Sequence, residues 1–577
     1  MLVQGGISSN DWRSLSEYGV DWIAFFRDFR STGNPSVSIQ KGVQLNPRFA
    51  RTTCSIAELA ALLKAGDFNS QELVKLYVQR VGEVNDDLGA VIELNPDAVS
   101  IARHLDRERA DGKVRGPLHG IPILVKDNYA TVDSMLTGSG SVCLARALPT
   151  EEATVIAKLR EAGAIILGKL NLSEFAGIRS SNATPGWSPR GGQTFGAYVK
   201  NQTACGSSSG SGVAASVGLA AGTLGTETSG SITCPAMYNN VVGVKPTVGL
   251  TSRFGVVPVT ARQDTTGPIT QNVEDAAILL EAMAGKDLND NYTSAQPWGS
   301  PPHFSTGLRK SGLKGARIGV VWMEDLPVSG HLINIKQIKP VFDRAVADLK
   351  SAGAEVVDVA LDTKGQTFEE ILLTLQTNVR VYMGADFNDA LPRYLENIRP
   401  SDDVVFRNVS DVLQCLKTEP RELASTIGLA DWENVAQLNI TAGSLEAWNA
   451  FTTVLTLSKS LLLDPIEEHG LDALVMLPDL ALSVGAAPGF PIVTVPMGVL
   501  GPEAKTAWDY TNKTISTGPG IPLGLSFTAD KWSDQKLIQY AYAYEQASQR
   551  RRELIPIIKP ESDLCTLIHR STLGGEM

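Results

Sequence analysis

Serine and glycine are concentrated in one stretch of the chain, where they supply residue types suited to nucleophilic chemistry. Residues 203–246 hold two clusters, Cys205-Gly-Ser-Ser-Ser-Gly210 and Gly225-Thr-Glu-Thr-Ser-Gly-Ser231, separated by small residues over 213–221. Glycine lets the backbone adopt positive φ and approach other groups closely, and a serine hydroxyl can donate, accept or attack. A flexible linker is the alternative interpretation. Because a linker does not usually enclose an apolar helix, we predict two loops packed over a short helix.

A serine nucleophile needs a base, and the histidines do not supply an obvious one. The six histidines are isolated in the sequence, so each is most simply a surface or core residue. Lys126 follows the apolar run Ile121–Val125, at the end of a predicted strand. Burial lowers the pKa of a lysine, and a neutral lysine can accept a proton. The alternative is an ordinary strand-end lysine that reaches solvent or pairs with Asp127.

Two other motifs match known sites only formally. Gly206-Ser-Ser208-Ser-Gly210 fits the G-x-S-x-G nucleophile elbow of α/β-hydrolases. That elbow follows a hydrophobic strand, whereas 200–205 is a poor strand, which disfavours Ser208. The run 163–170 resembles a phosphate-binding loop, but Leu170 stands where a metal-binding Ser or Thr is required. Metal-ligand spacings such as H-E-x-x-H are absent from the sequence.

Strand and helix signals alternate along the chain from Ser55 onward. A capping box at Ser55–Glu58 and a cap at Asn69 or Ser70 predict the first two helices. Further helices are predicted at 96–110, 151–162, 335–352 and 534–550, and strands at 90–94, 121–125, 164–167, 317–322, 355–360, 473–477, 492–495 and 522–527. Apolar strands that alternate with helices indicate a sheet covered on both faces. We predict one large α/β domain, with 286–314 as a long surface loop.

Composition limits the classes of protein that are compatible with the chain. It has 577 residues, a formal charge of −11, 43% hydrophobic residues and 20% charged residues, values of an ordinary globular protein. An acidic chain without a Lys/Arg cluster argues against nucleic acid as a partner. No run reaches the ~18 apolar residues of a membrane span. Six scattered cysteines without a C-x-x-C pair argue against a disulfide scaffold and fit a reducing compartment.

The compartment is the least constrained of these expectations. The first thirty residues include the charged side chains Asp11, Arg13, Glu17 and Asp21 and show no secretory apolar region, which favours a cytoplasmic protein. Seven N-x-S/T triplets leave a secreted form open.

The motifs together resemble the amidase signature family of serine hydrolases. The resemblance runs from Ser55 to Arg551 and rests on several motifs in order: Gly116–Asn128, Cys205–Gly210, Gly225–Ser231, Val244–Gly249, Asp264–Pro268 and Phe490–Gly498. Within the family the chain looks most similar to bacterial peptide amidases, which remove the C-terminal amide from peptides. The segments Asn95–Ala98, Gly186–Thr194 and Ser231–Ala236 carry that closer similarity.

The resemblance implies a fold and a set of site residues. The fold is a single α/β/α domain around a large mixed sheet, here 55–555, with an N-terminal extension at 1–54 and a C-terminal tail at 556–577. The site is a Ser–Ser–Lys triad in which Lys126 is the base, Ser207 the bridging serine after a cis Gly206–Ser207 bond, and Ser231 the nucleophile. The backbone N–H groups of Thr228, Ser229, Gly230 and Ser231 match the oxyanion hole, and the family needs no metal or cofactor.

Two departures from the family pattern concern the substrate pocket. Ser229 stands where many members have Gly or Asp, a change that keeps the backbone donors. The region 361–461, where part of the substrate pocket is expected, matches nothing closely.

The predicted function is hydrolysis of a linear carboxamide C–N bond through an acyl-enzyme. The substrate is expected to be a small-molecule or peptide amide, with C-terminal peptide amides as the first candidates. The alternatives are an ammonia-supplying subunit of an amidotransferase complex, an amidase of a secondary-metabolite amide, and a binding protein with an inactive triad. Neither nucleic acid nor a membrane is an expected partner, and a homodimer is one option for the assembly.

Overall fold

A computed structural model describes residues 54–322, 335–399 and 405–562. The predicted N-terminal extension lies almost wholly outside the described residues. At the other end, the part of the predicted C-terminal tail that is described lies against the domain. The N–H groups of Ile557 and Ile558 donate to the Ala197 carbonyl, and Ser562 bonds to Glu83.

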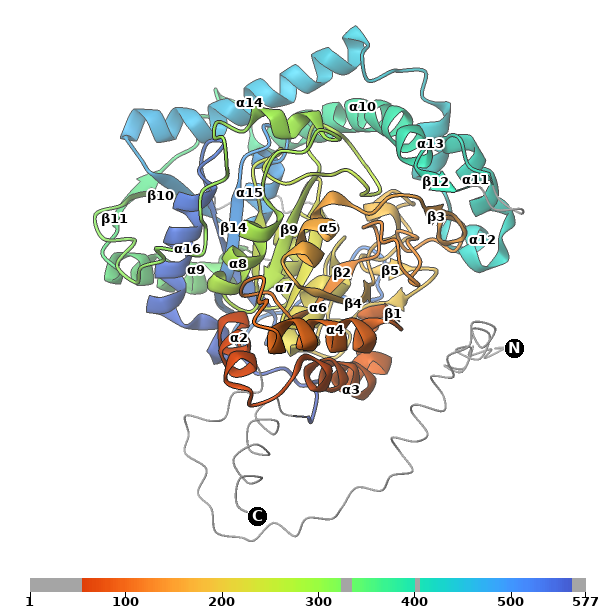
Figure 1. Cartoon of the computed structure of the whole chain (residues 1–577). Coiled ribbons are helices and arrows are strands. Elements are labelled where there is room, and N and C mark those ends of the chain that lie inside the picture. Colours follow the sequence, from red (N-terminus) through yellow and green to blue (C-terminus); the bar gives the residue numbers. More distant parts are fainter. Residues whose placement is uncertain (1–53, 323–334, 400–404, 563–577) are drawn as a thin grey trace.

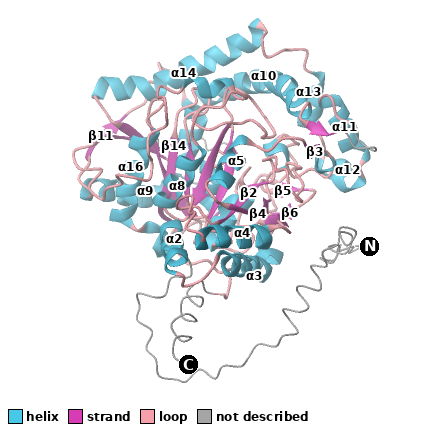
Figure 2. Ribbon diagram, viewed as in Figure 1, coloured by secondary structure: helices cyan, strands magenta, loops and turns pink. Residues whose placement is uncertain are grey.

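One mixed sheet of eleven strands organises the domain (Figures 1 and 2). In spatial order the strands are β1 (Val91–Leu94), β4 (Ile165–Leu170), β2 (Pro122–Lys126), β7 (Gly222–Glu227), β9 (Thr265–Thr270), β8 (Val242–Lys245), β14 (Ile492–Val499), β17 (Pro522–Thr528), β13 (Ala473–Met476), β10 (Arg317–Val321) and β11 (Glu355–Val359). The pairs β4–β2–β7 and β13–β10–β11 are parallel, and the remaining pairs are antiparallel. The predicted α/β class with a central mixed sheet is confirmed.

Helices cover the sheet and extend beyond its upper end (Figure 1). They are α2 (Ile56–Ala65), α3 (Ser70–Leu88), α4 (Ala98–Ala110), α5 (Thr154–Glu161), α6 (Ser209–Val217), α7 (Thr233–Tyr238), α8 (Val273–Met283), α9 (Ile335–Ser351), α10 (Phe368–Leu395), α11 (Val409–Thr418), α12 (Ala424–Ile427), α13 (Ala430–Gln437), α14 (Leu445–His469), α15 (Pro478–Gly485) and α16 (Asp534–Ser548). Helices α6, α7 and α15 pack together against the central strands, and α8, α9 and α16 form a second packed group. Three two-stranded pairs complete the structure: β3 (Leu148–Pro149) with β12 (Ile398–Arg399), β5 (Trp187–Ser188) with β6 (Gly192–Gln193), and β15 (Ala507–Trp508) with β16 (Ile515–Thr517).

The sequence signals for the first helices correspond to real caps. The Ser55 hydroxyl accepts from the Glu58 N–H while the Glu58 carboxylate accepts from the Ser55 N–H. Asn69 and Glu72 repeat the arrangement at α3. Each reciprocal pair satisfies two backbone donors that a helix start otherwise leaves unpaired. These caps fix where α2 and α3 begin, and both helices bury an apolar face against the sheet end that carries β1, β4 and β2.

Three central strands, β7, β8 and β9, were not predicted. Their sequences are rich in Gly and Thr, so they lack a hydrophobic signal. Their glycines are required by close packing. A Cβ on Gly267 would lie 2.0 Å from the Val244 carbonyl oxygen, and one on Gly225 would lie 2.8 Å from Ser208 Oγ. The Gly225–Ser231 motif and strand β7 are therefore part of the same stretch of chain.

The expectation drawn from the scattered cysteines is wrong. Two disulfides join Cys143 to Cys415 and Cys205 to Cys234. Their partners lie 272 and 29 residues apart in the sequence, so no local spacing motif marks them. The fold brings the cysteines together, and the compartment stays a prediction.

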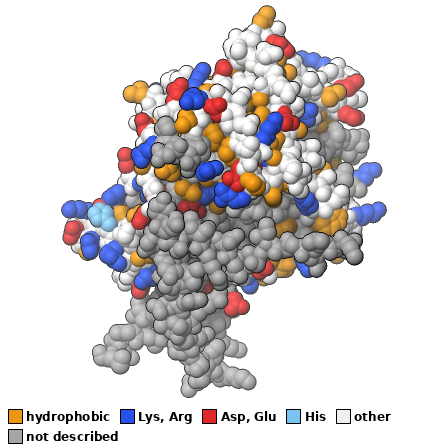
Figure 3. All heavy atoms as spheres, turned by 90° about the vertical axis from the view of Figure 1, so that its right-hand side faces the viewer, with side chains coloured by type: hydrophobic (Ala, Val, Ile, Leu, Met, Phe, Trp, Pro, Cys, Tyr) orange, Lys and Arg blue, Asp and Glu red, His pale blue; other side chains and the backbone are white. Residues whose placement is uncertain are grey.

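The surface and the helices carry two further observations. On the face that Figure 3 presents, basic, acidic and hydrophobic side chains are interspersed over the described part of the surface. Among the described residues, no helix is both long enough and apolar enough to cross a membrane.

Candidate active site

Lys126 ends β2, the third strand from the β1 edge of the sheet, and its side chain is completely buried. Its Nζ lies 2.7 Å from Ser207 Oγ, 3.0 Å from Ser208 Oγ, 2.9 Å from Thr226 Oγ1 and 3.3 Å from the Thr226 carbonyl oxygen. All four neighbouring atoms are neutral oxygens. The strand thus delivers a lysine to a site where hydroxyls surround its amine.

Burial lowers the pKa of Lys126 from 10.5 to about 7, although Asp264 and Glu227 oppose the shift. A lysine with this pKa is in large part neutral near pH 7 and can accept a proton. The alternative of an ion pair with Asp127 does not occur. Asp127 instead accepts two bonds of 2.8 Å from Arg190 and one from the Gly140 N–H.

The segment that carries Ser207 is fixed from both sides. The peptide bond Gly206–Ser207 is cis, as the family resemblance implies. The Ser207 carbonyl accepts from the Ser173 N–H at 3.0 Å, and the Ser208 N–H donates to the Ser231 carbonyl at 3.1 Å. A Cβ on Gly206 would lie 2.3 Å from Ser173 Oγ, so only glycine fits there. The Ser207 hydroxyl is thereby held between Lys126 and the segment that bears Ser231.

Ser231 lies in the tight turn between β7 and α7, and a buried carboxylate organises this turn. Glu227 Oε1 accepts from the Gly230 N–H at 2.8 Å, and Oε2 accepts from the N–H groups of Ile232 at 2.7 Å and Thr233 at 2.9 Å. Gly230 has φ +86°, and a Cβ there would lie 2.9 Å from Leu482. The turn therefore requires both the acid and the glycine.

The backbone N–H groups predicted to form the oxyanion hole differ in whether they already donate a hydrogen bond within the protein. The Gly230 N–H is bonded to Glu227, whereas no hydrogen bond among the described residues takes the N–H of Thr228, Ser229 or Ser231. Thr228 is fixed through its side chain, which donates to Asp264. An oxyanion site would consequently draw first on the Thr228, Ser229 and Ser231 amides, and the assignment of this site stays a prediction.

The nucleophile-elbow alternative does not fit the geometry around Ser208. Its side chain is fully buried, donates to the Thr226 carbonyl at 3.1 Å and accepts from the Thr226 N–H at 3.2 Å. The Ser231 hydroxyl, by contrast, has no hydrogen-bond partner among the described residues, and Ser231 keeps 7% of its surface exposed. Ser208 is bound into the framework that holds Lys126.

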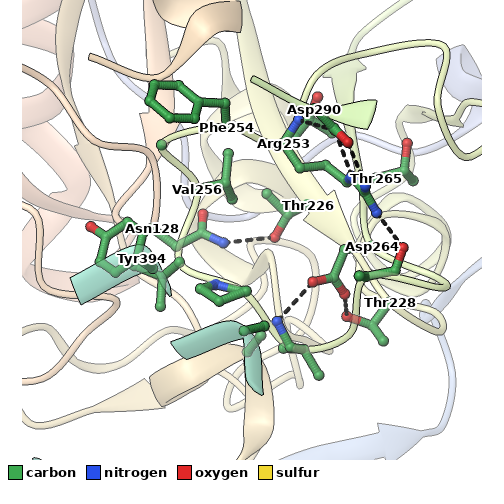
Figure 4. Close-up of a pocket in the computed structure, with 18 of the residues that line it drawn as sticks. Asn128, Thr226, Thr228, Arg253, Phe254, Val256, Asp264, Thr265, Asp290 and Tyr394 are labelled. Carbon is green, nitrogen blue, oxygen red and sulfur yellow. Dashed lines mark hydrogen bonds and ion pairs between the residues drawn. The ribbon is translucent and has the colours of Figure 1, made fainter. Parts of the chain in front are cut away.

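A cavity of about 300 Å³ lies next to this framework (Figure 4). Asn128 and Thr226 form part of its wall, and Asn128 Nδ2 donates to Thr226 Oγ1 at 2.9 Å. Three buried polar atoms of the wall have no protein partner among the described residues: Asn128 Oδ1, Thr265 Oγ1 and the Tyr394 hydroxyl. The cavity wall therefore has polar atoms free to bind a ligand. One of them, Asn128 Oδ1, belongs to a residue that bonds to Thr226, which in turn contacts Lys126.

Three residues that complete the site carried no predicted role. Glu227 holds the turn that carries Ser231, Thr226 contacts Lys126, and Asn128 donates a hydrogen bond to Thr226. Glu227 and Thr226 lie inside the Gly225–Ser231 motif, and Asn128 lies two residues after Lys126. Their position inside or next to these motifs was the only feature of the sequence that could have pointed to a role in the site. Within the described residues, no group of three or more His, Cys, Asp or Glu side chains could hold a metal ion.

Comparison with known proteins identifies the class to which this site belongs. The family model described as Amidase matches residues 72–538. A protein of Arthroderma benhamiae, named provisionally as an amidase, is 42% identical over 85% of this chain and 81% of its own. A probable amidase of Arabidopsis thaliana is 35% identical over 90% of this chain and 94% of its own.

A solved structure shows the same fold. The native peptide amidase from Stenotrophomonas maltophilia has a TM-score of 0.76 and 35% identity, covering 88% of this chain and 99% of that one. The chain belongs to the amidase family and is a hydrolase acting on C–N bonds.

Proposed function

We propose that this hydrolase cleaves linear carboxamides with Ser231 as nucleophile, Ser207 as proton bridge and Lys126 as base. The observation that carries the proposal is Lys126 itself, a fully buried amine without a carboxylate partner at 2.7 Å from Ser207 Oγ. Lys169 and Lys245 are equally buried and contact neutral oxygens, so the contact with the Ser207 hydroxyl is what distinguishes Lys126 as a base.

The hydrogen bonds around Lys126 support transfer of a proton from the Ser207 hydroxyl to the lysine amine. The Ser208 proton is committed to the Thr226 carbonyl, so Ser208 Oγ accepts from Nζ. A neutral amine has two N–H donors, and Ser208 Oγ and Thr226, through its Oγ1 or its carbonyl oxygen, can take both. Its lone pair then faces the Ser207 hydroxyl, which is the arrangement that a base requires.

The reaction follows from that arrangement. Lys126 takes the Ser207 proton while Ser207 takes the Ser231 proton, and Ser231 Oγ attacks the amide carbon. Backbone N–H groups of the turn stabilise the oxyanion, a kind of contact worth about 3–4 kcal/mol of barrier for one donor. The relay returns the proton to the leaving nitrogen, which departs as ammonia or an amine. Water then cleaves the acyl-enzyme by the same relay.

We infer that C-terminal peptide amides are the first substrates to test. The similarity to the peptide amidase of S. maltophilia over nearly its whole length supports this choice. A metabolite amide with a similar acyl group is the alternative within the same chemistry.

The test measures ammonia release from a panel of C-terminally amidated peptides and simple aryl amides, with wild-type enzyme and Ser231→Ala. We expect release from peptide amides and a loss in the variant on the order of 10⁴-fold or more, because the attacking atom is gone. Release from aryl amides alone would reject the peptide-amide proposal and keep the mechanism. Full activity of Ser231→Ala would reject the mechanism.

A further inference from the structure

A second cavity, of about 380 Å³, lies beneath α14, away from the residues that contact Lys126. Helix α14, which crosses the top of the molecule with α10 in Figure 1, contributes Phe451, Leu455, Lys459 and Leu463 to the wall. These residues are spaced by four and therefore share one face of the helix. The segments that follow α15 and β17 close the other side. The volume is that of a small-molecule site.

Positive charge is in excess on this wall. Neither Lys459 nor Lys531 makes an ion pair or a side-chain hydrogen bond among the described residues. The carboxylate of Asp530 accepts from the backbone N–H of Lys531 at 2.7 Å, and Arg262 is neutralised by Asp386 at 3.0 Å. Lys459, Lys531 and Asp530 are all exposed residues on this wall, so two ammonium groups share an open cavity with one carboxylate.

The ammonium groups of Lys459 and Lys531 also repel each other. Burial and the neighbouring charge of Lys459 lower the pKa of Lys531, and the opposite effect of Asp530 is smaller. An anion placed between the two lysines would remove this repulsion and supply the missing hydrogen-bond acceptors.

The remaining wall is apolar and aromatic. Phe451, Leu455, Leu463 and Phe490 line it, and the Arg262 guanidinium lies 5.0 Å from the centre of the Phe451 ring. Such a wall favours a ligand with an apolar body rather than a bare inorganic ion.

We propose that this cavity binds an organic anion, with its carboxylate or phosphate between Lys459 and Lys531 and its apolar part along Phe451 and Leu455. The inference goes beyond the proposed function. The cavity is connected to the nucleophile turn through Arg262, whose neighbour Gln263 donates to the Thr228 carbonyl at 3.1 Å. The anion is therefore either an acidic part of the amide substrate itself or a separate small molecule.

The test is a binding measurement and does not depend on turnover. Hexyl phosphate, hexanoate and 1-hexanol are titrated into the full-length protein by calorimetry at low salt. We expect the two anions to bind and the alcohol, which has the same apolar body, to bind at least about tenfold more weakly. The double variant Lys459→Gln/Lys531→Gln is expected to lose the preference for anions over the alcohol. The double variant Lys459→Arg/Lys531→Arg, which keeps both positive charges, is expected to retain it.

Lys64→Gln/Lys505→Gln is the matched control, because it removes the same charge at two exposed lysines outside the cavity. Equal loss of binding in the control would show a net-charge effect and overturn the proposal, as would equal binding of anion and alcohol. If amide turnover is found, competitive inhibition by hexyl phosphate assigns the cavity to an acidic part of the substrate. Binding without competition assigns it to a separate anion.

Discussion

At the scale of single residues, the environment of Lys126 decides what the site can do. A lysine at a strand end is ordinarily charged, and sequence alone could not choose between that state and a neutral base. The structure resolves the choice, because Asp127 is occupied by Arg190 and the amine faces only neutral oxygens. Desolvation therefore dominates the pKa of Lys126.

The pH dependence of catalysis follows from this pKa. In the proposed mechanism the neutral form of Lys126 is the base, and this form is lost as the pH falls through its pKa of about 7. We expect kcat/KM to fall about tenfold per pH unit below that value and to level off above it. Initial rates with an uncharged amide substrate measure the profile. A flat profile between about pH 5 and about pH 9 would contradict the assignment.

At the scale of elements, the turn from β7 to α7 depends on Glu227. The predicted effect of Glu227→Gln is twofold. Loss of the charge-assisted bonds to three backbone N–H groups loosens the Ser231 turn and lowers kcat by about 10- to 100-fold. Because the Glu227 charge raises the pKa of Lys126, its removal also shifts the acidic limb to lower pH.

The pH shift distinguishes an electrostatic role from a merely structural one. A kinetic pH profile of Glu227→Gln measures it, with the exposed Glu503→Gln as a control. Lower activity with an unmoved limb would mean that Glu227 acts on the turn alone.

The two disulfides are expected to act differently, because they join different elements. Cys205–Cys234 joins the segment before Ser207 to the helix after Ser231, whereas Cys143–Cys415 joins distant parts of the fold. Removing either pair with serine should cost about 2–4 kcal/mol of stability, and more for the longer loop of Cys143–Cys415. Activity at a temperature where both variants are folded should fall more for Cys205→Ser/Cys234→Ser.

Thermal melts and kcat measured on both double variants test whether the variant that loses more stability is the one that loses less activity. If the loss of activity simply followed the loss of stability, the positioning role of Cys205–Cys234 would be rejected.

At the scale of the whole molecule, the sequence predicted what periodic patterns and ordered motifs encode. Apolar strands such as β13 and the capped helices α2 and α3 were found because burial and caps leave local signals. The central strand β7 was not, because close packing required glycine where a hydrophobic residue would have marked a strand. The cysteine pairs were missed because only the tertiary fold brings them together. The motifs predicted Lys126, Ser207 and Ser231 as site residues, but the contacts of Glu227, Thr226 and Asn128 with this region became visible only in three dimensions.

The most direct test of the central claim is to locate the nucleophile. A fluorophosphonate is reacted with the wild-type enzyme, Ser231→Ala and Ser208→Ala, and the modified peptide is mapped by mass spectrometry. The account predicts an adduct on Ser231 in the wild-type enzyme and in Ser208→Ala, and no adduct in Ser231→Ala. An adduct on Ser208, or labelling that survives Ser231→Ala, would contradict it.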